Sequence, residues 1–386
     1  MPARPAVIEI YGNYLPSRGH EIIWIALSKE NGNNVVDNLF QGVSIYTISY
    51  PFISFFPLRF LRYIKYNYDK FKLIAKILNE ESFDIIQTRN NILDSIMAIY
   101  FKNKYNIQFV FQYSFPKGSY RHSIENNKSY FGKFECHFIK YVLDKADLVL
   151  PISKWMEVEL LKEGFPKSKM MPLPMGINPS WGNCDGEEHR MKVKYRLGNS
   201  KIILYSGTLD KLRKLDMIIE AFSIVRTLEF DVKLLIVGDG NDRLHLQELS
   251  ESIGYSKDII FAGKVSYFDM PTILKTATIA LCPVPPLDIY IVSSPTKLFE
   301  YMIMGIPIIA NEEIPEQREA IEESGGGVLA KFDAESFANN IIKLLNDPNE
   351  AIDIGIKGRK WVLRNRSYES MAIKVEKRYF DLLKIR

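Results

Sequence analysis

The chain has 386 residues, of which 47% are hydrophobic and 25% are charged. These proportions exclude an intrinsically disordered protein, and the length favours two domains because single domains cluster at roughly 100–200 residues. The opening segment lacks the apolar block of a signal peptide and no run of about 18 uncharged apolar residues follows, so we expect a cytoplasmic protein that does not span a membrane.

Residues that commonly hold metals or form disulfides are scarce. The three cysteines, Cys136, Cys184 and Cys282, lie far apart without a CxxC pair, so we interpret them as reduced thiols. The five histidines never stand at the short spacings that a zinc site needs. We therefore expect neither a protein-bound metal nor a cofactor.

In the first half, short apolar runs alternate with longer stretches of helical period. Strands separated by helices imply parallel pairing with right-handed crossovers, and hence a doubly wound sheet. The predicted strands are residues 7–10, 43–48, 84–87, 108–113 and 148–150, and the predicted helices are residues 19–28, a long stretch ending at residue 81, and residues 131–145.

The pattern breaks over residues 170–190, which we interpret as a linker, and then restarts. We predict domains at 1–178 and 179–366, followed by a terminal helix at 367–386. Two Rossmann-like sheets that face each other leave a cleft at the carboxyl ends of their strands, where ligands bind. In the second half the predicted strands are residues 201–205, 233–237, 258–261, 279–281 and 306–310, and the predicted helices are residues 216–226, 242–253, 296–304 and 334–345.

The segment around Ser294 and Pro295 is the most informative one. Ser294 is a good N-cap and Pro295 a good first helical residue, so we predict a helix with free N–H groups at Thr296 and Lys297. Those donors and the helix dipole form an anion site worth about 0.3–2 kcal/mol for a phosphate, before the Lys297 charge is added. A plain capped helix with an exposed Glu300 is the alternative.

Residues 295–310, PTKLFEYMIMGIPIIA, resemble the signature of the retaining family 4 glycosyltransferases, the glycosyl transferases group 1, which have the GT-B fold. The resemblance continues through YSGTL, LLIVGDG, FAGKV and the GGGVLAKFDAESFANNIIKLLND tail. It implies an acceptor-side domain at 1–178, a nucleotide-sugar-binding domain at 179–366 and a C-terminal helix at 367–386 that returns to the first domain.

The resemblance also assigns roles to individual residues. The amides near Lys297 and Leu298 would meet the distal phosphates of the donor, and Glu300 would accept hydrogen bonds from the ribose hydroxyls. Gly19 would lie in a loop between the first strand and its helix, touching donor and acceptor. The donor-binding residues implied in this way are Gly19, Gly207, Thr208, Gly238, Lys264, Val265, Ser294, Thr296, Lys297, Leu298 and Glu300; for Gly238, Lys264 and Val265 a purely structural loop remains the alternative.

Arg213 and Glu300 are the predicted catalytic residues. The family has an Arg where Thr208 stands and a Lys at the place of Arg213, which can still act as the cation beside the leaving diphosphate. Its loss should lower the rate by about 10²–10³, unless Arg213 is merely a solvated surface residue. Val292 replaces a second family Glu, so sugar contacts from that position are not carried over. No side-chain base is assigned, because retention in this family is thought to need none.

Residues 50–78 are rich in aromatic and basic residues. Such a face suits an anionic membrane surface, although an amphipathic helix packed on its own sheet fits equally well. No nucleic-acid-binding pattern accompanies these residues, so we expect no nucleic acid partner.

Taken with the resemblance, these features predict a retaining glycosyltransferase, cytoplasmic or peripheral at the inner face of the membrane. It would move a hexose-type sugar from a nucleotide-diphosphate donor, such as a UDP-sugar, to a cell-envelope glycan or a lipid-linked saccharide acceptor. The alternatives are a nucleotide-sugar epimerase or hydrolase, and a non-catalytic nucleotide-binding partner subunit.

Overall fold

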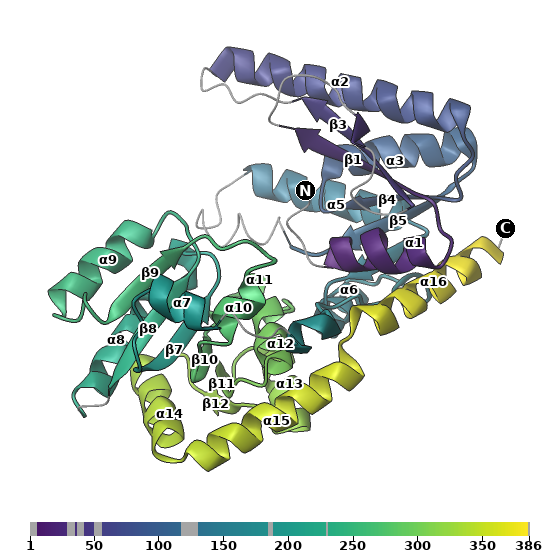
Figure 1. Ribbon diagram of the computed structural model, residues 1–386. Coiled ribbons are helices and arrows are strands. Elements are labelled where there is room, and N and C mark those ends of the chain that lie inside the picture. Colours follow the sequence, from purple (N-terminus) through teal and green to yellow (C-terminus); the bar gives the residue numbers. More distant parts are fainter. Residues whose placement is uncertain are drawn as a thin grey trace. The chain divides into compact units, whose positions relative to one another are not determined.

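The computed structural model describes residues 6–28, 35–36, 42–49, 56–116, 130–183, 188–228 and 231–384 (Figure 1). The chain divides into two compact units. Unit 1 comprises Met1–Pro174 together with Tyr368–Arg386, and unit 2 comprises Met175–Ser367. Each unit is an α/β assembly of parallel strands and flanking helices, as in a Rossmann-like domain.

The described strands of unit 1 form two small sheets rather than one continuous sheet. In one, β1 pairs in parallel with β3, and β2 is antiparallel to β3. In the other, β4, β5 and β6 are all parallel, with the fully buried Phe109, Phe111 and Leu148 at its centre. The bounds are β1 Ile22–Ser28, β2 Val35–Val36, β3 Val43–Ser49, β4 Ile85–Arg89, β5 Gln108–Tyr113 and β6 Leu148–Pro151.

The helices of unit 1 have recognisable local signals. Asn91 and Ser153 cap α3 and α6 by accepting the N–H groups of Asp94 and Met156, and Asn106 ends α3 in the left-handed conformation. The bounds are η1 Val7–Tyr14, α1 Leu15–Ser17, α2 Phe56–Glu80, α3 Ile92–Tyr105, α5 Tyr130–Lys145, α6 Lys154–Lys162, η2 Lys167–Lys169 and α16 Tyr368–Lys384.

The amino-terminal elements differ from the sequence prediction. Residues 7–10, predicted as the first strand, belong to the π-helix η1, and residues 22–28, predicted as part of a helix, form strand β1. A four-residue run such as VIEI fits one helical turn as well as a strand, and periodicity cannot separate the two. Glu9 is buried and accepts a hydrogen bond from Asn13 one turn further on, while the Ile- and Trp-rich β1 finds its partner in β3.

Unit 2 contains one parallel sheet with the order β12-β11-β10-β7-β8-β9. The chain runs outward from β7 through β8 to β9, and then resumes at β10 on the other side of β7. The switch point of this sheet therefore lies between β7 and β10, where ligands of open α/β sheets bind beyond the carboxyl ends of the strands. The bounds are β7 Lys201–Ser206, β8 Val232–Val237, β9 Ile259–Gly263, β10 Ile279–Cys282, β11 Ile308–Asn311 and β12 Val328–Ala330.

Helices α8 and α14 each bury an apolar face against this sheet. Phe222 of α8 and Phe337 of α14 are fully buried in a common core with strand residues such as Leu234. The bounds are η3 Pro179–Asn183, α7 Glu188–Lys194, η4 Lys211–Arg213, α8 Asp216–Arg226, α9 Arg243–Ser252, α10 Met270–Leu274, α11 Asp288–Ile291, α12 Thr296–Ile303, α13 Pro315–Ser324, α14 Ala334–Asn346 and α15 Pro348–Asn365.

The chain passes between the units twice, at residues 174–175 and 367–368. On the side of unit 2 these two passages are bonded to each other, because the Ile177 N–H donates to the Arg366 carbonyl at 2.8 Å. Helix α16 then packs on η1 in unit 1, where the Tyr379 hydroxyl donates to Gln87 and lies 3.3 Å from the Tyr11 hydroxyl. The final helix thus returns to the first unit. Over the described part of the chain, no helix combines the length and apolar character needed to cross a bilayer.

Candidate functional site

Loops that follow β7 and β10 meet at the switch point of the unit 2 sheet. The first contains Gly207, Thr208 and η4, and the second contains α11 and leads into α12. Most of the sequence-predicted site residues fall on these two loops, in α12 or on the neighbouring loop after β8. Their geometry decides which of them can serve a ligand.

Two glycines allow the loops after β7 and β8 to pass very close to each other. Gly207 has φ +152° and Gly238 has φ +141°, a region that favours glycine. A Cβ atom on Gly238 would lie 1.8 Å from the Gly207 carbonyl oxygen, so no larger residue fits. The Gly207 N–H donates to Val237 and the Gly238 N–H to Gly263, which ties the carboxyl ends of β7, β8 and β9 into one surface.

Lys297, in the first turn of α12, reaches back to this surface. Its Nζ lies 3.9 Å from the centroid of the Tyr205 ring. A Cβ atom on Gly207 would lie 2.8 Å from the same Nζ, so the ammonium group occupies the space that the missing side chain leaves. Among the described residues, Lys297 has no carboxylate partner. The Tyr205 ring holds this positive charge in place.

Arg213 is held in the same way. It ends η4, which begins after Asp210 accepts the Leu212 N–H, and its guanidinium carbon lies 4.4 Å from the centroid of the Tyr290 ring on α11. No carboxylate in the part of the chain that the structure describes pairs with Arg213. The loop after β10 thus supplies the ring that orients a cation from the loop after β7.

The pKa of the buried Cys282 thiol, at the last residue of β10, is influenced by the charges of Lys297, Arg213 and Glu300. Burial raises the pKa of Cys282 to about 12; the charges of Lys297 and Arg213 oppose this rise and that of Glu300 adds to it. The thiol donates to Gln317 Oε1 at 3.0 Å, so it is an inert part of the core. The three charges therefore converge on the carboxyl end of β10.

Glu300 lies one turn further along α12 than Lys297. Desolvation raises the pKa of this carboxyl to about 7, although the nearby Lys297 charge works against the rise. The side chain keeps part of its surface exposed and makes no hydrogen bond or ion pair with any residue that the structure describes. Its two oxygens are thus available to hydroxyl groups of a ligand.

The capping prediction for Ser294 is wrong. The residue at the N-cap position is Pro295, and Ser294 is turned inward, accepting the Met175 N–H at 2.9 Å and donating to Glu316 Oε1 at 3.0 Å. Both roles of its hydroxyl are taken by protein groups, because Ser294 is buried where the chain enters unit 2. Ser294 therefore stabilises the start of α12 through its contacts with Met175 and Glu316.

The carboxylate that Ser294 contacts belongs to a buried ion pair. Glu316 lies 3.0 Å from Arg366, and the Arg366 guanidinium stacks over the Phe299 ring of α12 at 4.7 Å. Burial raises the pKa of Glu316 to about 7, against the opposing Arg366 charge. This pair holds α12 both at its start and along its body.

Two amides at the start of α12 remain available to a ligand. The Leu298 N–H donates to the Pro295 carbonyl at 3.1 Å, so the predicted contact of this amide is already occupied. Thr296 and Lys297 have no acceptor for their N–H groups among the described residues, as expected in a first helical turn. These two donors lie at the amino end of α12, which is the positive end of the helix dipole.

The remaining predicted residues lie along the same edge of the sheet. Thr208 follows Gly207, and its carbonyl accepts the Tyr205 hydroxyl at 3.4 Å. Lys264 and Val265 directly follow β9, which pairs with β8, and Gly238 directly follows β8. Val292 is buried after α11.

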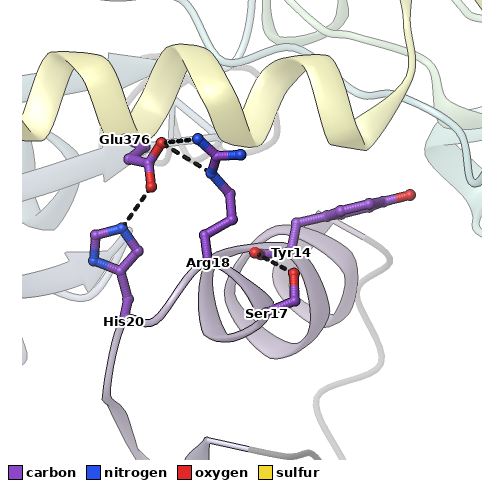
Figure 2. Close-up of polar contacts among 5 residues, drawn as sticks. All are labelled: Tyr14, Ser17, Arg18, His20 and Glu376. Carbon is purple, nitrogen blue, oxygen red and sulfur yellow. Dashed lines mark hydrogen bonds and ion pairs between the residues drawn. The ribbon is translucent and has the colours of Figure 1, made fainter.

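Gly19 does not lie in a loop between a strand and its helix. It follows α1 and precedes β1, so it lies at the amino end of that strand, away from the carboxyl ends where ligands bind. Figure 2 shows the neighbouring side chains directed at α16: Arg18 donates twice to Glu376 Oε2, at 2.9 and 2.6 Å, and His20 Nε2 lies 2.8 Å from Oε1. The structure therefore removes the basis on which Gly19 was assigned to the donor.

Sequence reasoning missed the residues that orient the two cations. Tyr205 is part of the YSGTL motif but had no role, and Tyr290 stands in no motif. Nor did any local signal connect Glu316 with Arg366, which are fifty residues apart. The position of Tyr205 two residues before Gly207 is the one signal that would have drawn attention to it.

Comparison with known protein families agrees with this geometry. Residues 7–181 match the model described as Glycosyltransferase Family 4, and residues 187–361 match the model described as Glycosyl transferases group 1. The two matches together leave only the ends of the chain and residues 182–186 uncovered. The chain belongs to the family 4 glycosyltransferases, and its fold is of the GT-B type.

A curated relative from Mycolicibacterium smegmatis, a GDP-mannose-dependent alpha-(1-6)-phosphatidylinositol monomannoside mannosyltransferase, is 22% identical over 230 residues. That match spans 59% of this chain and 60% of the relative. Among solved structures, the sucrose-phosphate synthase of Thermosynechococcus elongatus is similar with a TM-score of 0.76 at 18% identity, covering 97% of this chain and 92% of its own. Anabaena HepE in complex with UDP and glucose has a TM-score of 0.67 at 13% identity, covering 92% of this chain and 98% of its own.

Proposed function

We propose that this protein is a retaining glycosyltransferase that moves a hexose-type sugar from a nucleotide-diphosphate donor to a glycan or lipid-linked saccharide. The observation that carries the proposal is the pair of cations, Lys297 and Arg213, each stacked on a tyrosine and neither paired with a carboxylate in the described structure. A diphosphate supplies the two negative charges that such a pair lacks. The two free amides of α12 add donors at the same place.

In this proposal each residue has a separate task. Arg213 and Lys297 stabilise the negative charge that develops on the diphosphate as the glycosidic carbon–oxygen bond breaks. Lys297 takes over the charge that the family obtains from the residue after the glycine, where this chain has Thr208. Glu300 accepts hydrogen bonds from the ribose hydroxyls.

The proposed transfer balances without a protein base. The acceptor hydroxyl oxygen bonds to the anomeric carbon on the face from which the diphosphate leaves. Its proton passes to the departing phosphate oxygen. Retention of configuration follows from this same-face exchange.

Comparisons with relatives support the substrate classes at a coarse level. The Mycolicibacterium relative is named for GDP-mannose and a phosphatidylinositol acceptor, and HepE binds UDP and glucose. We therefore propose a nucleotide sugar as donor and an acceptor drawn from envelope glycans or lipid-linked saccharides, with a cytoplasmic or peripheral membrane location.

The test is a screen of UDP- and GDP-sugars with the full chain, with and without extracted cell glycans and glycolipids. We expect nucleotide release that depends on acceptor, and an α-linked product from an α-linked donor. Release without acceptor would identify a hydrolase, and conversion of the donor sugar an epimerase. Nucleotide binding with no turnover in any mixture would leave a non-catalytic subunit, and each of these three outcomes overturns the proposal.

A further inference from the structure

Strand β7 loses its strand partner on one side just before it reaches the site. Its pairing with β8 continues to the last residue, where Ser206 stands opposite Val237. Its pairing with β10 ends earlier, at Leu204, which stands opposite Ala280. On the β10 side, the last two residues of β7 therefore have no strand pairing in the described structure. Because backbone donors in a core need an acceptor, another group must serve the N–H that points to this side.

The hydroxyl of Tyr301 serves that N–H. The Ser206 N–H donates to the Tyr301 hydroxyl oxygen at 2.8 Å, and Ser206 Oγ lies 2.9 Å from the same atom. Tyr301 is fully buried and stands on α12, directly after Glu300. Burial raises the pKa of Tyr301 well above its ordinary value, so the hydroxyl stays protonated and cannot act as a base. What it does is join α12 to the end of β7.

Helix α12 thus contacts the end of β7 and its turn at two points. Lys297 and Tyr301 are four residues apart and lie on the same face of the helix. The ammonium group of Lys297 reaches Tyr205 and Gly207, while Tyr301 bonds to Ser206 between them. A hydrogen bond is more directional than the contact of an ammonium group with a ring. The Tyr301 hydroxyl therefore sets the distance between α12 and the glycine turn.

We propose that Tyr301 is a positioning residue of the donor site. Its hydroxyl holds the start of α12, with Lys297 and the two available amides, at the distance from the glycine turn that a diphosphate needs. Small displacements of such groups weaken anion binding and slow the reaction, because both depend on alignment. This role rests on the proposed function, but it belongs to a side chain that is too deeply buried to touch a ligand.

The experiment measures binding of inorganic pyrophosphate to the full chain by calorimetry, with kcat for sugar transfer as a second readout. Tyr301→Phe keeps the ring and therefore the packing, so the variant should fold, with a Tm lower by about 2–5 °C. We expect its dissociation constant for pyrophosphate to rise by about tenfold, and kcat to fall by about 10–100-fold with the acceptor KM unchanged. Lost stability alone changes neither quantity at a temperature where the variant is fully folded.

The matched control is Thr278→Val, which removes a hydroxyl at the other end of the same strand. Thr278 Oγ1 accepts the Ile202 N–H at 3.0 Å, as the Tyr301 hydroxyl accepts that of Ser206. The control replaces a side chain of similar size and lies at the amino end of β7, away from the site. It should bind pyrophosphate like the unchanged protein.

Equal pyrophosphate binding by Tyr301→Phe and the unchanged protein, or an equal loss in Thr278→Val, would overturn the positioning role and leave the proposed function standing. Absence of pyrophosphate binding by the unchanged protein would overturn the positioning role as well. Pyrophosphate binding that only Tyr301→Phe weakens, without transfer in any mixture of nucleotide sugar and acceptor, would support the positioning role and overturn the proposed function.

Discussion

Two loops of this protein present basic side chains, and the fold treats them in opposite ways. In unit 1, Arg18 and His20 both contact the carboxylate of Glu376, so each already has an acidic partner within the protein. In unit 2, Arg213 and Lys297 lie over tyrosine rings and have no carboxylate partner among the described residues. The first loop lies at the amino end of a parallel strand and the second at the carboxyl end.

The difference teaches how to separate structural from functional charge. A cation that is paired with a carboxylate is already neutralised, so its replacement mainly lowers the free energy of unfolding. A cation that is oriented by an aromatic ring but not neutralised is available to an anionic ligand. Its replacement therefore mainly weakens ligand binding and lowers the reaction rate. Each of the following experiments tests that distinction, beginning with the largest expected effect.

Removal of Glu316 should be the most damaging change. Glu316→Ala leaves the Arg366 guanidinium, whose side chain is only 17% exposed, without its partner, which costs about 3–5 kcal/mol of unfolding free energy. Urea unfolding measures this loss. Glu322→Ala, an exposed position on the same helix, is the control. Replacing both charges, with Glu316→Leu and Arg366→Met, should recover most of the stability; a double variant as unstable as the single one would contradict this account.

Arg213→Ala and Lys297→Ala should each lower the rate of sugar transfer by about 10²–10³, or roughly 3–4 kcal/mol in the activation barrier. The free energy of unfolding should change by less than about 1 kcal/mol, because neither cation forms an ion pair with a residue that the structure describes. Lys211→Ala, in the same short helix as Arg213, is the control for general charge. A large loss of stability with little loss of kcat would reverse the assignment.

Donor binding should strengthen as the pH rises from 6 to 8. The pKa of Glu300 is raised to about 7, so the carboxylate that accepts ribose hydroxyls is the minor form at pH 6 and the major form at pH 8. We expect about a tenfold gain in affinity for a nucleotide sugar, whose diphosphate diester does not titrate in this range. Calorimetry at several pH values measures it. The affinity of Glu300→Gln for the nucleotide sugar should not depend on pH in this range. An identical pH profile in that variant would contradict the prediction.

Glu376→Gln should have the smallest effect, because Arg18 and His20 are partly exposed. We expect the Tm to fall by about 2–4 °C and transfer to be unchanged. The hydrogen bond from Arg18 lowers the pKa of Glu376 below its ordinary value, so the pair stabilises the folded state above the unfolded pKa and this contribution is lost on acidification through the folded pKa. The difference in Tm between the two proteins should therefore shrink at low pH. Glu369→Gln on the same helix is the control, and a loss of transfer in Glu376→Gln would show that the paired loop is functional.

The sequence alone predicted five of the six described strands of unit 2, and four of its helices, α8, α9, α12 and α14. Residues 216–226 and 108–113 were predicted with the bounds that α8 and β5 have in the structure, because apolar periodicity and length both favoured one assignment. At the start of the helix that carries Lys297, local backbone geometry predicted an anion site, and the role of Glu300 came from the resemblance to the family. Such local signals can be interpreted without knowledge of the fold.

Tertiary structure decided what local patterns could not. Whether residues 7–10 form a strand or a helix depended on partners distant in sequence, as did the pairing of β1 with β3. Whether Ser294 caps a helix or supports it depended on Met175 and Glu316, and the rings of Tyr205 and Tyr290 became relevant only when cations from other segments were laid over them. The physical reason is that pairing and burial are set by contacts between distant segments, while periodicity and capping are set by neighbours in the chain.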